Sequence, residues 1–296
     1  MEQGALIGVD LGGTKVVAGL ITNGRLIKNS YKLISAGSRN PQDVVDEIIS
    51  VITDLINEEV LAIGIGIPGL IDRAEGVVND IQNIPSWKEV RLKEILENHF
   101  NVSVFLDNDA NCFALGEARF GAGIHEKDFV GITLGTGMGG GIIKNGFLLS
   151  DAHCGSGEFG NIAYRDATYE DYCSGKFFKN KFGLKGEELA LLAARGDKMA
   201  LKAFDEFGLH LGNAIKTIKL AVDPHKVIIG GSVAKASQYF ETSMWKALLD
   251  FPFPNAMKDF DVVFSSVENI AVLGAASLYF DNNRSVKMVK QLFNEN

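Results

Sequence analysis

The sequence predicts an α/β protein made of two related halves, each with a mixed β-sheet flanked by helices. A pair of apolar strands joined by a turn rich in glycine and threonine occurs twice, with turns at residues 12–14 and 135–137. In both copies the second strand closes on an Asn-Gly pair, at Asn23 and at Asn145, which is a strong signal for a β-hairpin. Strand and helix patterns then follow each hairpin, as expected for helices packed on the faces of a sheet.

The first half opens with three strands and continues with a helix. Strands are expected at residues 5–11, 16–22 and about 26–34. Asn40 and Pro41 are typical of a helix start, because Asn caps free backbone N–H groups and Pro fits the first turn. Apolar residues then keep helical spacing. The remaining elements are expected as a strand at 60–67, a helix at 92–100, a strand at 102–106 and a helix at 110–120.

The second half repeats the hairpin and is richer in helices. Its first two strands are expected at residues 129–134 and 138–144, and a longer loop region is expected at about 150–175. The later elements are helices at 186–195 and 198–222, a strand at 226–229, a helix after residue 232, a strand at 261–265 and a terminal helix from 271 to at least 280.

Composition limits the classes of protein to which the chain can belong. It has 296 residues, 46% of them hydrophobic, and a net charge of -8. These values exclude a disordered chain and make nucleic acid or an anionic membrane an unexpected partner. The first strand begins near Ala5, so no targeting segment is expected, and no apolar stretch approaches the ~18 residues that span a bilayer. Three widely spaced cysteines are expected to be reduced thiols of a cytoplasmic protein.

Three glycine-rich turns are candidates for contact with a nucleotide. Asp10 and the turn Gly12-Gly13-Thr14-Lys15 end the first strand, and Gly135-Thr136-Gly137 occupies the same place in the second hairpin. Glycine lets the backbone approach a ligand closely, and turn amides suit phosphate oxygens. Gly230-Gly231 lies at a later strand-to-helix turn. The alternatives are a tight hairpin, a bulged hairpin and an ordinary strand-to-helix turn, respectively.

Asn108 and Asp109 form a fourth candidate site, at another strand-to-helix turn. A carboxylate in this place can accept a proton from a substrate hydroxyl. The alternative is a helix N-cap without a chemical role.

Taken together, these motifs resemble the ROK family of bacterial sugar kinases, repressors and related proteins. The resemblance is carried by motifs in family order at residues 10–15, 64–69, 108–111, 134–141, 157–160 and 230–232. It implies an actin-like ATPase, or ribonuclease H-like, fold with an active-site cleft between two α/β domains. We expect domains at 1–117 and 118–270, with the C-terminal helix 271–296 packing back on the first.

The resemblance also implies roles for single residues. Asp109 is expected to be the general base, and Asp10 to hold magnesium through water. The nucleotide would be bound by Gly12, Gly13, Thr14, Lys15, Gly135, Thr136, Gly137, Gly230 and Gly231, and the sugar by Gly69, Asn83, Asn108, Asp109, Glu158, Asn161 and Glu170.

One departure from the family pattern is clear. The family usually has a histidine where this chain has Asn161, followed by a cysteine-rich loop that binds structural zinc; that string of cysteines is absent here. We therefore expect no structural zinc, and a short loop packed by Phe159, Tyr164, Tyr169 and Tyr172. The residue that replaces the family histidine also makes the identity of the sugar uncertain.

The leading interpretation is an ATP- and Mg²⁺-dependent hexose kinase, with glucose as the first candidate acceptor and a homodimer as the expected assembly. N-acetylmannosamine, N-acetylglucosamine, mannose, fructose and allose are alternative acceptors. A sugar-responsive transcriptional regulator is disfavoured, because hardly any sequence precedes the first hairpin. A sugar-binding protein without catalysis is disfavoured because Asp10, Asp109 and both turns are present.

Overall fold

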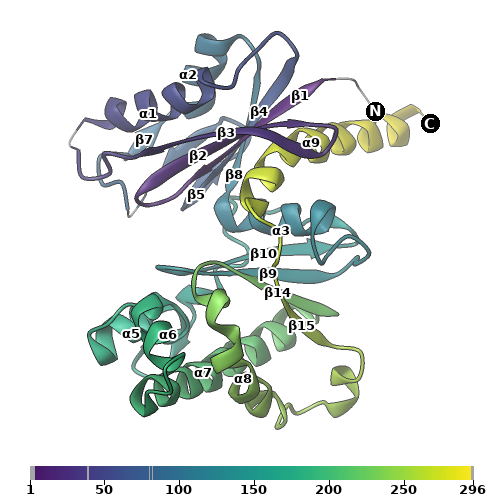
Figure 1. Cartoon of the computed structure of the whole chain (residues 1–296). Coiled ribbons are helices and arrows are strands. Elements are labelled where there is room, and N and C mark those ends of the chain that lie inside the picture. Colours follow the sequence, from purple (N-terminus) through teal and green to yellow (C-terminus); the bar gives the residue numbers. More distant parts are fainter. Residues whose placement is uncertain (1–3, 39, 80, 82, 295–296) are drawn as a thin grey trace. The chain divides into compact units, whose positions relative to one another are not determined.

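The computed structural model describes residues 4–38, 40–79, 81 and 83–294, with side chains through Asn282. Its contacts divide the chain into two compact units (Figure 1). Unit 1 consists of Met1–Ile124, Gly146–Ser156 and Val267–Asn296. Unit 2 consists of His125–Asn145 and Gly157–Ser266. Unit 2 is therefore inserted in the sequence of unit 1, which begins and ends the chain.

The main sheet of unit 1 is mixed, as the sequence predicted. Its five strands have the order β3-β2-β1-β4-β8. The hairpin strands β1 and β2 are antiparallel, whereas β4 is parallel to both β1 and β8. The bounds are β1 (Ala5–Leu11), β2 (Lys15–Thr22), β3 (Arg25–Leu33), β4 (Val60–Ile67) and β8 (Ser103–Asn108).

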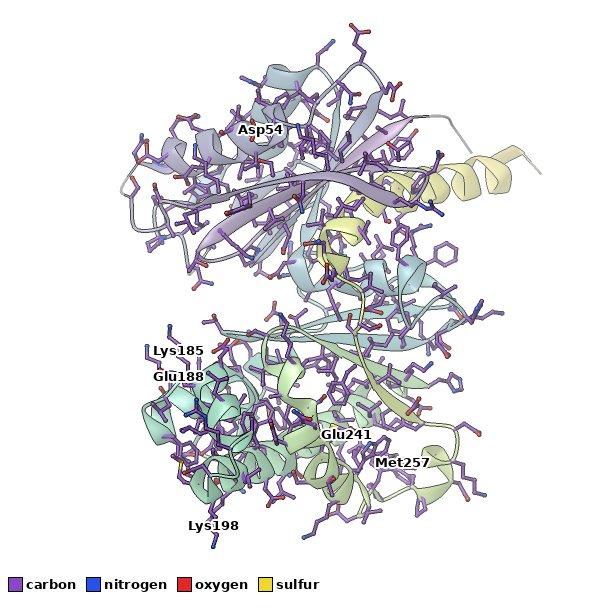
Figure 2. All side chains as sticks on the ribbon, in the orientation of Figure 1. Asp54, Lys185, Glu188, Lys198, Glu241 and Met257 are labelled. Atoms are coloured by element: carbon purple, nitrogen blue, oxygen red, sulfur yellow. The ribbon has the colours of Figure 1, made fainter. Side chains whose placement is uncertain are left out.

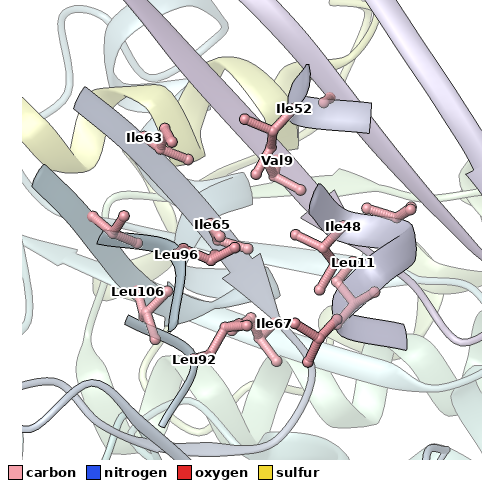
Figure 3. Packing of buried hydrophobic residues seen from close by; sticks show 14 of the residues in the cluster. Val9, Leu11, Ile48, Ile52, Ile63, Ile65, Ile67, Leu92, Leu96 and Leu106 are labelled. Carbon is pink, nitrogen blue, oxygen red and sulfur yellow. The ribbon is translucent and has the colours of Figure 1, made fainter. Parts of the chain in front are cut away.

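Helices cover both faces of this sheet. The helices α1 (Pro41–Thr53) and α2 (Leu92–Phe100) pack on one face, where alternate residues of β1 and β4, such as Val9 and Ile65, are buried among their apolar residues (Figure 3). The opposite face carries α3 (Asp109–Phe120) and α9 (Ile270–Asn294). A Cβ atom at Gly64 would lie only 1.8 Å from the Ala275 carbonyl oxygen. Glycine in β4 therefore allows α9 to lie directly on the sheet.

Several short strands of unit 1 were not predicted. A second sheet contains β5 (Leu70–Asp72), β6 (Val77–Asn79) and β7 (Glu89–Val90), and β11 (Phe147–Leu148) follows the second Asn-Gly turn. Strands of two or three residues are too short to show a period of two, so the sequence pattern does not reveal them. Asn23, Gly24, Asn145 and Gly146 all have positive φ, which confirms both predicted turns.

The sheet of unit 2 contains β10, β9, β14 and β15 in that order. The hairpin strands β9 and β10 are antiparallel, and β14 is parallel to β9 and β15. The strand bounds are β9 (Phe129–Leu134), β10 (Met138–Lys144), β14 (Lys226–Gly230) and β15 (Asp261–Phe264). The helices are α4 (Tyr169–Cys173), α5 (Gly175–Phe182), α6 (Gly186–Ala193), α7 (Lys198–Val222) and α8 (Glu241–Leu248), with 3₁₀ turns at Phe159–Asn161, Val233–Tyr239 and Pro254–Met257.

The region expected as a loop at 150–175 contains a compact hairpin and the helix α4. The hairpin strands β12 (Ala163–Tyr164) and β13 (Ala167–Thr168) are antiparallel. Tyr164 stacks on Tyr169 with ring centroids 4.4 Å apart, and its hydroxyl group bonds to His210 Nδ1 over 3.1 Å. Tyr172 also packs against His210. Aromatic contacts thus hold this segment against α7.

Within the part of the chain that the structure describes, no helix is both long enough and apolar enough to cross a bilayer.

Candidate active site

Asn108 and Asp109 lie where β8 ends and α3 begins, as the sequence predicted. Asn108 is the N-cap of α3: its Oδ1 atom accepts hydrogen bonds from Ala110 N over 2.9 Å and from Asn111 N over 3.4 Å. Its Nδ2 atom donates to the Gly69 carbonyl oxygen over 3.2 Å. Because Asn108 serves as the cap, Asp109 stands at the first helical position, where its Oδ1 atom accepts from Ala110 N over 2.9 Å.

Asp10 lies next to Asp109 in unit 1. Asp10 pairs with Gly66 of β4, and a Cβ atom at Gly66 would lie 3.4 Å from Asp109 Cα, so the first turn of α3 packs closely on this part of the sheet. Burial and, to a smaller extent, the negative charge of Asp10 together raise the pKa of Asp109 to about 6. Burial likewise raises the pKa of Asp10 to about 6, against an opposing effect of Lys15. Two carboxylates therefore meet where charge is poorly solvated.

Such a pair fits a divalent cation. Within the described residues, no group of three or more His, Cys, Asp or Glu side chains is arranged to hold a metal. A magnesium ion at Asp10 would therefore take most of its ligands from water and from substrate phosphates, which is common for magnesium in phosphoryl-transfer enzymes.

A buried ion-pair network supports the turn at Asn108. Asp107 is 3% exposed, and Arg73 binds both of its carboxylate oxygens, through Nε over 2.8 Å and through Nη2 over 3.1 Å. Arg73 Nη1 also donates to Asp151 Oδ1 over 2.8 Å. Asp107 Oδ1 in turn accepts from Asn108 N over 2.7 Å and from Asn111 Nδ2 over 2.8 Å. The network joins the segment Gly146–Ser156 to the end of β8.

The first glycine-rich turn is closed by a backbone hydrogen bond, and two of its residues are exposed to solvent. Gly12 N donates to the Lys15 carbonyl oxygen over 2.9 Å, and Thr14 and Lys15 are exposed. A Cβ atom at Gly13 would be 3.5 Å from the side chain of Asn83. The structure therefore places Asn83, predicted for the sugar, beside the turn predicted for phosphates.

In unit 2 the second glycine-rich turn is held by Ser174 and Gly175, at the junction of α4 and α5. Gly175 N donates to the Gly135 carbonyl oxygen over 2.7 Å, and Ser174 Oγ donates to the Thr136 carbonyl oxygen over 3.1 Å. Within the turn, Gly135 N donates to the Gly137 carbonyl oxygen over 3.0 Å. These bonds fix the backbone of a turn that its two glycines would otherwise leave flexible.

A cavity of about 1070 Å³ opens beside this turn. Gly135 and Thr136 line it, whereas Gly230 and Gly231 immediately precede two of its lining residues, Ser232 and Val233. Four lysines and one acidic residue face it: Lys176, Lys179, Lys185, Lys235 and Glu187. Lys185 stands at the start of α6 (Figure 2). The excess of positive charge suits an anionic ligand, even though the chain as a whole is acidic.

The other predicted sugar ligands also lie in unit 2, where two of them touch. Asn161 Nδ2 donates to Glu158 Oε2 over 2.8 Å. Glu170 lies at the glycine-rich turn instead, where its Oε2 atom accepts from Met138 N over 3.0 Å. The structure therefore groups Asn108, Asp109, Asp10, Asn83 and Gly69 in unit 1. It places Glu158 with Asn161, and Glu170 with the second turn, in unit 2.

Sequence reasoning missed Arg73, Asp107, Asp151 and the four lysines of the cavity. Arg73 pairs with residues 34 and 78 positions away, so no local pattern could have revealed the network. For Lys176 a signal was present. Ser174-Gly175-Lys176 is a turn of small residues that opens a helix, which is a common setting for anion contacts.

Comparison with known proteins places these features in a family. The ROK family model matches residues 6–282. The chain is 33% identical to a glucokinase of Thermotoga maritima, over 94% of this chain and 98% of the relative. It is 32% identical to an N-acetyl-D-glucosamine kinase of Photobacterium profundum, over 77% and 84% of the two chains.

A solved structure shows the same architecture. A ROK family glucokinase from Streptomyces griseus, in complex with glucose and AMPPNP, superposes with a TM-score of 0.81 at 28% identity, over 93% of this chain and 99% of that one. This similarity confirms the predicted actin-like fold class. With a family match over nearly the whole sequence, the chain belongs to the ROK family.

Proposed function

We propose that this protein is a sugar kinase that transfers the terminal phosphoryl group of ATP to a hydroxyl group of a hexose. The observation that carries the proposal is Asp109, a partly buried carboxylate at the start of α3 whose pKa is raised to about 6. Its neighbour Asp10 and the cavity beside Gly135 add a candidate cation ligand and a candidate anion site. The similarity to glucokinases and to a structure solved with glucose and AMPPNP supports this reading.

In this proposal Asp109 is the general base. The hexose oxygen attacks the γ-phosphorus, and its proton passes to the Asp109 carboxylate. The bond from the γ-phosphorus to the oxygen that bridges the β- and γ-phosphates breaks, and ADP leaves with the electron pair. A carboxylate whose pKa is about 6 is ionised at neutral pH yet is basic enough to accept the proton. Most of the rate enhancement would come from positioning and from charge stabilisation.

The nucleotide is assigned to the two glycine-rich turns and the lysine-lined cavity. The turns Gly12-Gly13-Thr14-Lys15 and Gly135-Thr136-Gly137 would border the phosphates. The N–H groups of Gly12 and Gly135 are bonded within their own turns, so the amides of Gly13, Thr14, Thr136 and Gly137 would bind the phosphate oxygens. Gly230 and Gly231 would lie near the nucleoside. Magnesium, when bound near Asp10, would neutralise charge on the phosphate oxygens.

The sugar is assigned to Asn108, Asp109, Gly69 and Asn83 from unit 1 and to Glu158, Asn161 and Glu170 from unit 2. Carboxylates and amides of this kind bind sugar hydroxyl groups as acceptors and donors. Glucose is the proposed acceptor, because the relative from Thermotoga maritima is a glucokinase. N-acetylglucosamine is the first alternative, since a relative of similar identity is a kinase of that sugar.

A coupled assay of ADP release over a panel of hexoses and N-acetylhexosamines tests the proposal. We expect sugar-dependent ADP release with ATP and magnesium, fastest on glucose, and its loss in Asp109→Asn. Release without sugar, or none on any sugar, would contradict kinase activity. Sugar binding measured by calorimetry in the absence of turnover would instead favour a binding or regulatory protein.

A further inference from the structure

An ion pair in unit 2 joins a predicted sugar ligand to the lysine-lined cavity. Lys176 Nζ donates to Glu170 Oε1 over 2.6 Å. Lys176 lines the cavity together with Gly135 and Thr136, whereas Glu170 is assigned to the sugar. The pair therefore connects the two ligand groups of the proposed reaction, and it lies entirely within one unit.

Both oxygens of the Glu170 carboxylate have donors from the protein. Lys176 binds Oε1, and the backbone N–H of Met138 binds Oε2 over 3.0 Å. A Cβ atom at Gly137 would lie 2.4 Å from Oε2, so only glycine at this position lets the carboxylate reach the turn. The Glu170 carboxylate therefore binds the second glycine-rich turn through one oxygen and the Lys176 ammonium group through the other.

The backbone at Lys176 is fixed, while its side chain can move. Ser174 Oγ accepts from Lys176 N over 3.2 Å and caps α5, and Gly175 N is bonded to Gly135. The side chains of Lys176 and Glu170 are 43% and 25% exposed. An ion pair this exposed contributes little stability. A lysine on its flexible stem can therefore leave it for a phosphate oxygen.

We propose that Lys176 is a positioning residue that couples sugar binding to donor binding through Glu170. A sugar hydroxyl that donates to Glu170 takes up part of its charge and weakens its hold on Lys176. The ammonium group then turns to the phosphates of the donor. By linkage, a donor that attracts Lys176 frees Glu170 for the sugar. This inference rests on the proposed function and on the assignment of Glu170 to the sugar.

Calorimetry with magnesium and AMPPNP tests the coupling. The dissociation constant of AMPPNP is measured with and without a saturating amount of the sugar that the wild type phosphorylates best. We expect the sugar to tighten AMPPNP binding by ~5-fold or more in the wild type. In Lys176→Met the ratio of the two constants should fall close to one, and in Lys176→Arg it should be largely restored.

Lys179→Met is the matched control, because Lys179 also lines the cavity and lies one turn of α5 further on. It should weaken AMPPNP binding by the same factor with and without sugar, so the ratio should stay at the wild-type value. If folded Lys176→Met gives the same ratio of AMPPNP dissociation constants as the wild type, the inference is overturned. The kinase proposal is not affected by that result, provided that the wild type phosphorylates a sugar. Absence of turnover by the wild type on every sugar would overturn both.

Discussion

Replacing Asp109 by Asn should greatly reduce turnover and at the same time make the ligand-free protein more stable at alkaline pH. The amide keeps the size of the side chain, and its oxygen can still accept the bond from Ala110 N, which is 2.9 Å long in the wild type. Only the charge and the basicity are lost. Without a base for proton transfer, we expect kcat to fall by ~10²–10⁴-fold.

The stability effect follows from the pKa of Asp109, which is raised from 3.8 to about 6 by burial and by Asp10. A raised pKa means that the folded state binds the proton more tightly than the unfolded state. The wild type therefore loses stability as the pH rises from about 4 through 6, and the cost is complete above that range. This rise corresponds to at most ~3 kcal/mol. Because Asp109 is partly exposed, solvent screening reduces the expected gain to ~1–2 kcal/mol.

Thermal unfolding with a chelator present, followed by circular dichroism from pH 4 to pH 8, measures this gain. At pH 8 the variant should melt ~2–5 °C above the wild type. At pH 4, close to the ordinary pKa of 3.8, the difference should be much smaller. Asp46→Asn on α1 is the control for the removal of one negative charge at an exposed position of unit 1. Wild-type turnover in Asp109→Asn, or a stability difference that is equal at pH 4 and pH 8, would refute the reasoning.

Three further outcomes are expected. Asp10→Ala should raise the KM for magnesium-ATP by ~10-fold or more and change sugar affinity by less than ~2-fold, because Asp10 is assigned to the cation. Titrating each substrate separately distinguishes the effect on the nucleotide from the effect on the sugar. A loss confined to sugar affinity would contradict the assignment. The purified protein should contain no stoichiometric zinc, and a chelator should leave its melting temperature unchanged, since structural zinc contributes folding free energy where it is present; about one zinc per chain by elemental analysis would show this to be wrong. Asn161→Ala should lower kcat/KM on the best sugar by a factor that corresponds to ~1–3 kcal/mol, because a sugar hydroxyl loses its partner and Glu158 loses the Nδ2 donor 2.8 Å away. Asn161→His should instead change the ranking of sugars. Unchanged kinetics of the alanine variant on every sugar would remove Asn161 from the site.

Elements with strong local signals could be predicted from the sequence. The helix expected at 198–222 is α7 (Lys198–Val222), and both hairpins form around their glycine-rich turns. Length made α7 predictable, because twenty-five residues repeat the helical period several times. The helix α5 was missed: its eight residues begin with Gly175 and carry three lysines, which gives too little periodicity to separate a helix from a loop.

The candidate site was predictable in its residues but not in its connections. Asp10 and Asp109 were recognisable because Asp10 lies near the end of a strand, next to a glycine-rich turn, and Asp109 lies where a strand passes into a helix. The pKa of both carboxyl groups is raised by burial, and that of Asp109 also by the charge of Asp10, which no linear pattern records. Arg73 illustrates the same limit, because its two carboxylate partners come from distant segments that only the folded chain brings together.

The order of unit 1 in the chain has a consequence for synthesis. The ribosome delivers the chain from its N-terminus, so the whole of unit 2 emerges before Val267–Asn296, which supplies α9. Until then the part of β1 and β4 around Gly8 and Gly64, which α9 covers in the folded protein, is left uncovered. The unit that is made first is therefore completed last, and an unfinished chain exposes an apolar face to other proteins. Loss of the C-terminal helix would likewise uncover the sheet that holds Asp10, more than 250 residues away in sequence.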